Sequence, residues 1–406
     1  MATRNVSLSN LRGIVIIIVV AFHASLAYLV SAPPLAPFNQ PPYSWQAFPI
    51  VDSHRWIGFD AFCAWQDTNL MALMFLLSGL LTSGSLGRKG PASYIYDRLW
   101  RIGAPFLFAI VVLSPISIFP AYLARTTAPS APDFLQTWIS LPSWPTGPQW
   151  FLWQLLVLNI LAVLAYVAYP NTLGRLHRLA AWLGERPVGF FAILAGMSIL
   201  AYAPLSLSFS PWSWSALGPF SLQLCRPLLY LVFFATGVCL GSGGIDRGLL
   251  ASDGPLAKNW WQILIAALLS FGIWAAFTSY ALPDWGKAPA WAKFGTSVVF
   301  PLACVSGSFF LLSFCLRYAG HVRVHALDSI SANAYSIYLV HYVFVVWLQY
   351  LLLGTDLIAG AKFAFVFIGA LAASWSISSA WSRLMDSRWP VFQKRAAVRV
   401  PSRMRV

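Results

Sequence analysis

The sequence predicts an all-α integral membrane protein with about ten transmembrane helices and both termini in the cytoplasm. Of the 406 residues, 59% are hydrophobic and only 9% are charged, whereas a soluble chain carries about a quarter charged residues. The apolar residues also fall into segments of about twenty, which is the length that crosses a bilayer as a helix. Composition and segment length together predict the fold class.

Ten segments satisfy the spanning criterion: 11–31, 66–86, 103–123, 150–169, 188–206, 222–241, 260–279, 295–316, 330–350 and 361–382. When they alternate across the membrane, twenty of the 26 basic residues fall on the side of the N-terminus. Basic loops stay in the cytoplasm, so we expect both termini there and a multi-pass protein of the cell inner membrane. The net charge of +14 therefore follows membrane topology and does not indicate nucleic-acid binding.

The chain is expected to be one transmembrane domain, residues 1–385, followed by a basic cytoplasmic tail, residues 386–406. The stretch 388–406 has six basic residues and no acid, which suits contact with anionic lipid headgroups. The five cysteines show no CxxC spacing. We therefore expect them to be packing residues, with neither a disulfide framework nor a metal site.

The first segment carries two ionisable residues, Arg12 and His23, eleven positions apart. On a helix they project from nearly the same face, separated by roughly 16 Å along the axis. Ionisable groups at membrane depth are costly and indicate function. The alternatives are a positive-inside anchor for Arg12, a packing role for His23, and a cleaved signal peptide.

A second group of basic residues precedes the third segment, where Arg98 and Arg101 stand three apart on one helix face. Closely spaced guanidinium groups bind phosphate well, so these two residues, with Arg12, are candidates for binding a phosphorylated donor. An ordinary basic loop is the alternative interpretation.

Other polar residues recur within the segments. His341 lies about as deep in the ninth segment as His23 in the first, which predicts either a shared cavity or packing. Either Asp60 or Asp67, just outside or at the head of the second segment, could orient His23, and Asp67 is the preferred candidate because it is nearer the membrane. Trp150, Gln154 and Arg226 are candidate substrate contacts, although tryptophans often form the interfacial belt.

Five stretches resemble motifs of the acyltransferase-3 family of membrane acyltransferases, and they occur in that family's order. They are Arg12 and His23 with ten residues between them, LMALMFLLSGLL (70–81), DRLWRIGAPF (97–106), GPQWFLWQLLVLN (147–159) and SANAYSIYLVHYVF (331–344). Some members carry a glutamate in the fourth of these stretches. This chain has only Gln149 and Gln154 there, and in this it is similar to the glucan-modifying (succinyl-glucan type) branch or to a generic subgroup of the family.

The resemblance implies transfer of an acetyl or succinyl group from acyl-coenzyme A to a hydroxyl of a glycan or lipid-linked sugar. No bound cofactor or metal is expected, because acyl-coenzyme A is itself the donor substrate. The chemistry needs a base of near-neutral pKa, and imidazole is the natural one. His23 is therefore the expected general base, with His341 as a second acid–base or hydrogen-bonding group. A transporter or flippase for a glycan or lipid is the alternative, although the repeated halves typical of transporters are not evident in the sequence.

Overall fold

The computed structural model describes residues 5–41, 43–169, 171–320 and 323–388. In these residues it shows an all-α polytopic membrane protein, as the sequence predicts, with one small β-hairpin. Within the described ranges, nine helical segments are long and apolar enough to span a membrane. They are α1 with η1 (Val6–Ser25, Leu26–Tyr28), α2 (Ile57–Lys89), the series α3–η3–α4–η4–α5 (Pro91–Arg98, Leu99–Gly103, Ala104–Phe108, Ala109–Leu113, Ser114–Leu123), α7 (Trp150–Ala168), α9 (Pro187–Phe209), α12 (Trp260–Ala281), α13 (Ala290–Tyr318), α14 (His325–Leu351) and α15 (Ala359–Arg388).

The shorter elements are η2 (Ser44–Gln46), α6 (Ala131–Ser140), η5 (Gly147–Gln149), α8 (Thr172–Gly184), β1 (Trp214–Leu217), β2 (Phe220–Gln223), α10 (Pro227–Gly243), η6 (Gly248–Leu250) and α11 (Pro255–Lys258). Most of the tail expected over 386–406 lies outside the described residues, because the description ends at 388.

The sixth predicted span, 222–241, begins later than expected. Residues 220–223 form strand β2, which pairs antiparallel with β1, and helix α10 starts only at Pro227. Gly218 has a φ of 56° at the first position of the two-residue turn, which is where such hairpins place glycine. Helix α10 has 17 residues and is followed, after a bend of 90°, by residues Gly248–Lys258. Counted as one broken span, these two pieces bring the number of candidate spans among the described residues to ten.

The third span contains two π-helical turns, and each ends two residues before a proline. Segment η3 precedes Pro105, and η4 precedes Pro115. A proline inside a helix donates no hydrogen bond and clashes with the carbonyl four residues earlier. The wider π turn gives that carbonyl room, which explains why this span stays helical through both prolines.

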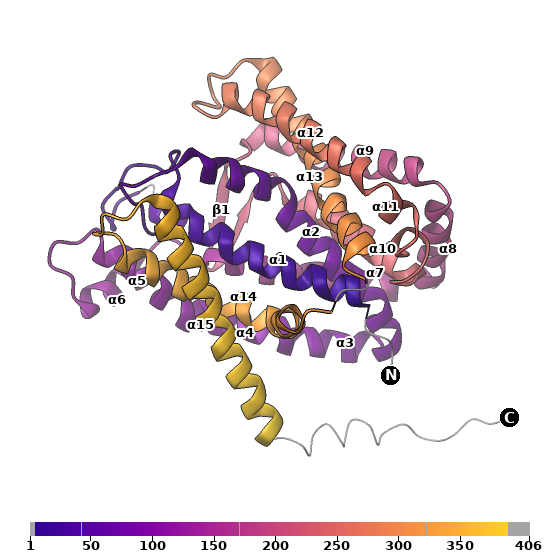
Figure 1. The fold of residues 1–406 in the computed structure, drawn as a ribbon, viewed down its shortest axis with the longest axis horizontal. Coiled ribbons are helices and arrows are strands. Elements are labelled where there is room, and N and C mark those ends of the chain that lie inside the picture. Colours follow the sequence, from indigo (N-terminus) through magenta and orange to yellow (C-terminus); the bar gives the residue numbers. More distant parts are fainter. Residues whose placement is uncertain (1–4, 42, 170, 321–322, 389–406) are drawn as a thin grey trace.

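Helix α1 lies in the middle of the bundle, where it packs against α14, α13, α15 and α2 (Figure 1). Helices α2 and α10 form another close pair because glycines line their contact. A Cβ added at Gly237 would lie 2.2 Å from the carbonyl oxygen of Leu76. We call the end at which α1 begins the inner end and the opposite one the outer end.

Loops at the outer end form a cap with its own hydrophobic core. We define the outer cap as residues 29–41, 43–56 and 124–141, the last of which include the helix α6. Its buried aromatic side chains, Phe38, Trp45, Phe134 and Trp138, belong to the same cluster as Tyr342 of α14. The cap therefore covers the outer parts of α1 and α14.

Candidate active site

A cavity of about 530 Å³ lies toward the inner end, between α1, α2, α7, α14 and the first half of the third span. Three arginines line it: Arg12 from α1, Arg98 from α3 and Arg101 from η3. These are the three residues that the sequence proposes for the donor phosphates. Positions 12 and 98 are far apart in the chain, so only the fold brings these cations to one cavity.

The two cations of the third span have different surroundings. Arg101 Nε lies 2.8 Å from Asp97 Oδ1, and Lys89 Nζ lies 3.0 Å from Asp97 Oδ2. The guanidinium of Arg98 lies 4.7 Å from the centre of the Tyr94 ring, and its buried Nε has no hydrogen-bond partner among the described residues. Asp97 therefore holds Arg101 and Lys89, while Arg98 retains hydrogen-bonding capacity.

The remaining cavity wall combines apolar and polar side chains. Val15, Ile16, Phe151 and Leu152 provide apolar surface along its length. Asn159 is the amide in the wall, and its Oδ1 accepts a hydrogen bond from the hydroxyl of Tyr94. A cavity with cations at one part and apolar walls elsewhere suits a ligand with an anionic head and a less polar arm.

The two predicted histidines are in direct contact. His341 Nε2 lies 3.2 Å from His23 Nδ1, and the ring centroids are 5.0 Å apart. His341 is fully buried and His23 is half-buried. Gln349 fixes the backbone beside His23, because its Nε2 donates to the carbonyl oxygens of His23 and Ala24 at 3.0 and 3.2 Å.

The neighbouring carbonyl groups determine where the protons of this pair lie. His341 Nδ1 is 2.7 Å from the carbonyl oxygen of Tyr338, which only accepts, so Nδ1 carries the proton and Nε2 is an acceptor. His23 Nδ1 faces that acceptor and also the carbonyl oxygen of Val19 at 2.9 Å. In the neutral pair His23 Nδ1 is therefore the donor, and His23 Nε2 keeps the lone pair that accepts a proton.

Tyr338 connects the cavity to the histidines. Its side chain lines the cavity, its carbonyl oxygen binds His341, and its hydroxyl donates to the carbonyl oxygen of Pro148. Tyr335, one turn earlier on α14, also lines the cavity. Both tyrosines belong to the Tyr-x-x-Tyr-Leu-x-His segment of the stretch 331–344, but the sequence analysis assigned neither of them a role in the site. Tyr338 precedes His341 by three positions, which is one helical turn.

The structure corrects the expected contact between Asp67 and His23. Both carboxylate oxygens of Asp67 bind Arg226, at 2.7 and 2.6 Å, in a bidentate ion pair. The guanidinium of Arg226 also lies 4.8 Å from the centre of the Phe300 ring. Because Arg226 is buried and has no other acid beside it among the described ion pairs, Asp67 is the partner that compensates this charge, and His341 and the Val19 carbonyl orient His23 instead.

The three residues proposed for substrate binding lie away from the inner cavity. Trp150 packs on Tyr230 at a centroid distance of 5.9 Å, and Tyr230 in turn lies 3.5 Å from Arg226. Gln154 is buried, and its Nε2 has no hydrogen-bond partner among the described residues. Trp150 and Arg226 are thus brought near each other, but none of the three lines the cavity.

In the described residues, no group of three or more histidine, cysteine or acidic side chains is arranged to hold a metal ion. The model of the acyltransferase-3 family, described as an acyltransferase domain, matches residues 5–379. The chain belongs to the acyltransferase-3 family. This acyltransferase-3 protein is accordingly an acyltransferase that moves groups other than amino-acyl groups, and a multi-pass membrane protein. No curated protein and no solved structure gives a significant match to it.

Proposed function

We propose that this protein transfers an acetyl or succinyl group from acyl-coenzyme A to a hydroxyl of a glycan or lipid-linked sugar in the cell inner membrane. The observation that carries this proposal is the continuity of the site. One cavity is lined by Arg12, Arg98 and Arg101, and its wall residue Tyr338 is hydrogen-bonded to the histidine pair.

The dimensions of α1 suit an extended donor. The eleven residues from Arg12 to His23 span roughly 16 Å along the helix, which is about the reach of a pantetheine arm. Phosphates bound by the arginines would leave the arm between Val15, Ile16, Phe151 and Leu152. The thioester, at the far end of the arm, would then lie close to His23. Charge-assisted contacts between the arginines and the phosphates would hold the opposite end of the donor in place.

The histidine pair supplies the proton transfers of the reaction. The acceptor hydroxyl attacks the thioester carbonyl while its proton moves to His23 Nε2, which forms the new C–O bond and a tetrahedral oxyanion. Collapse of that intermediate breaks the C–S bond, and the proton passes from His23 to the departing thiolate. His341 Nε2 accepts a hydrogen bond from the positively charged His23 ring, because the geometry already points this nitrogen at His23 Nδ1.

The acceptor is proposed to approach from the outer end, near Trp150, Gln154 and Arg226. A tryptophan face suits stacking against a sugar ring, and the unpartnered amide of Gln154 suits a hydroxyl. Glycan hydroxyls carry no charge, which agrees with a region where the single guanidinium of Arg226 is already paired with Asp67.

The test is donor binding and turnover by the purified protein in detergent. Binding and hydrolysis of acetyl- and succinyl-coenzyme A are compared for the wild type, His23→Ala and the double variant Arg98→Ala/Arg101→Ala. Arg178→Ala is the matched control, since Arg178 is an exposed cation of α8 that does not line the cavity. We expect the double variant to lose binding, and His23→Ala to bind the donor without consuming it. A wild type that neither binds nor consumes either donor would overturn the proposal and favour the transporter alternative.

A further inference from the structure

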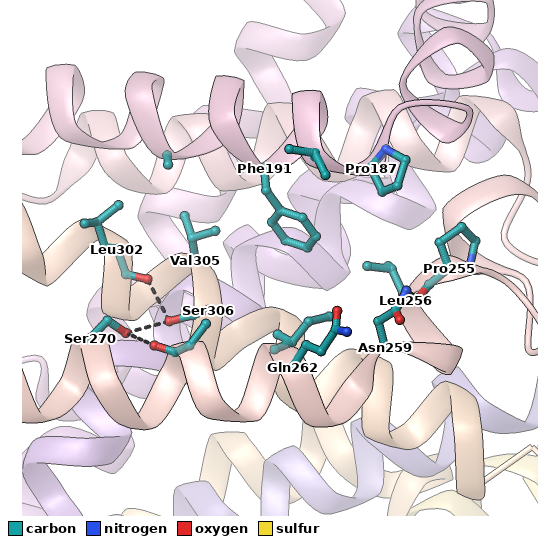
Figure 2. Close-up of a pocket in the computed structure, with 14 residues that line it drawn as sticks. Pro187, Phe191, Pro255, Leu256, Asn259, Gln262, Ser270, Leu302, Val305 and Ser306 are labelled. Carbon is teal, nitrogen blue, oxygen red and sulfur yellow. Dashed lines mark hydrogen bonds between the residues drawn. The ribbon is translucent and has the colours of Figure 1, made fainter.

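A second cavity, separate from the arginine-lined one, is a largely apolar groove of about 460 Å³ between α9 and α12. Both helices pack on α13, which provides the floor through Leu302 and Val305, and α11 closes one end. Figure 2 shows Phe191 pointing from α9 into this space, with Pro255 and Asn259 at one end and the Ser270–Ser306 pair at the other.

The groove is open on the outer surface of the helix bundle. Val188 of α9 lines it and is 82% exposed, and Ala266 of α12 lines it and is also exposed. Both helices are membrane-span candidates in which most of the apolar window lies on the surface. What surrounds that surface in a membrane is lipid hydrocarbon, so a lipid chain has direct lateral access to the groove.

The length of the groove corresponds to one leaflet. Its lining on α12 runs from Asn259 to Ser270, which is eleven residues or about 16 Å of helix. The hydrocarbon core is about 30 Å thick, so the groove extends from one surface to roughly the middle of the bilayer. The end at Asn259 lies at the inner end, since α9 begins there with Pro187. Its depth therefore suits one acyl chain of a lipid in the inner leaflet.

The inner mouth of the groove is polar and favours an anion. Asn259 and Gln262 contribute amide groups, and the exposed Lys258 precedes Asn259. Two long helices, α9 and α12, also begin here, so the positive ends of both helix dipoles lie at the mouth. Two exposed cations adjoin lining residues: Arg186 precedes Pro187, and Lys258 precedes Asn259. Arg186 has its neighbour Glu185 at 3.9 Å, whereas Lys258 has no acid partner among the described ion pairs, and Asp253 lies in the preceding loop. Lys258 and the helix ends therefore provide uncompensated positive charge next to the groove.

We propose that this groove binds an anionic phospholipid of the inner leaflet, with one acyl chain between α9 and α12 and the phosphate beside Lys258. This site is distinct from the donor cavity, with which it shares no lining residue, and it does not depend on the proposed transfer reaction.

The test is native mass spectrometry of the purified full chain with phosphatidylglycerol and with phosphatidylcholine of identical acyl chains. We expect one phosphatidylglycerol to be retained in preference to phosphatidylcholine. Lys258→Gln should lower phosphatidylglycerol affinity about fivefold, since a basic residue near an anionic headgroup contributes about 1 kcal/mol. Ala266→Trp should fill the groove and displace both lipids.

Two control variants make the same types of substitution at positions outside the groove. Lys287→Gln removes an exposed lysine in the loop between α12 and α13, at the outer end. Leu269→Trp adds a tryptophan on an exposed face of α12 that does not line the groove. Both should bind lipid as the wild type does. Equal retention of the two lipids, or a phosphatidylglycerol preference that survives both Lys258→Gln and Ala266→Trp, would overturn the proposal.

Discussion

The inner cavity and the outer end of the molecule differ in how far their cationic side chains are buried and paired with acids. At the inner cavity, the Arg101 side chain is 72% exposed and the buried Nε of Arg98 has no partner among the described residues. At the outer end, Lys362 and Asp52 are both fully buried, and Lys362 Nζ lies 3.0 and 2.7 Å from the two carboxylate oxygens. One region keeps cations available at a cavity, while the other neutralises them inside its core.

The outer cap also uses a second cation to hold its loops. Arg125 donates to the carbonyl oxygens of Phe48, Pro49 and Ala121, and burial lowers its pKa to about 10. It therefore stays charged at neutral pH, where the three carbonyl dipoles compensate it. Charges paired at the outer end stabilise the cap over the outer parts of α1 and α14. At the inner end, Arg98 and Arg101 instead line the cavity that is proposed to bind the anionic donor.

The largest expected effect is on stability, at the ion pair below the outer cap. Lys362→Met removes the lysine from the buried carboxylate of Asp52 and leaves it only the His54 ring, 3.4 Å away, and the His54 backbone N–H, so the free energy of unfolding should fall by about 3–5 kcal/mol. Chemical denaturation in detergent measures it. Lys287→Met is the control, because that lysine is exposed at the outer end and its loss should cost less than about 0.5 kcal/mol. The double variant Lys362→Met/Asp52→Leu should recover most of the loss. If Lys362→Met and Lys287→Met lowered the free energy of unfolding equally, the buried ion pair would not be what stabilises the outer end.

The next effect concerns the histidine pair under the cap. His341→Ala removes one of the two acceptors of His23 Nδ1–H and leaves only the Val19 carbonyl oxygen. We therefore expect kcat to fall on the order of 10²-fold, the low end for acid–base catalysis, while KM for the donor stays unchanged. Tyr342→Phe is the control, since its ring, 5.3 Å from that of His23, is retained. An equal loss in both variants would mean that packing around His23, rather than the proton relay, limits the rate.

A smaller loss of stability is expected when the ion pair between Asp67 of α2 and Arg226, just before α10, is weakened. Asp67→Asn weakens the contact to Arg226, and because the Asp67 side chain is 37% exposed the unfolding free energy should fall by only about 1–2 kcal/mol. Turnover per folded molecule, and its pH profile, should remain those of the wild type. A shifted pH profile would instead support the sequence-based hypothesis that Asp67 orients His23.

The smallest expected effect is a change in donor affinity at the inner cavity. Asp97→Asn removes the acid that holds Arg101 and Lys89 and so increases the positive charge offered to the donor. Donor affinity should rise, by at most about fivefold, since one charge at 4 Å contributes about 1 kcal/mol in water. Equilibrium binding at low and high salt measures this gain, which salt should reduce. Weaker binding would show that Asp97 is needed to position Arg101.

Much of the architecture followed from the chain itself. The spans were predictable because a bilayer demands about twenty apolar residues in a row, and this demand is local. The start of the sixth span was missed because Leu222, Leu224 and Cys225 directly precede the apolar run of α10 in the sequence. The Gly218 turn and Pro227 instead set the hairpin and the start of the helix. The π turns before Pro105 and Pro115 likewise depend on local sterics that hydropathy does not report.

The sequence by itself determined the fold class, the family motifs and the presence of ionisable residues at membrane depth, because helix length and spacing are properties of one segment. Only the tertiary structure decided their partners. It placed His23 against His341, three arginines around one cavity, and Asp67 against Arg226. Buried polar groups must find partners within reach, and which groups are within reach depends on how helices distant in the sequence pack together.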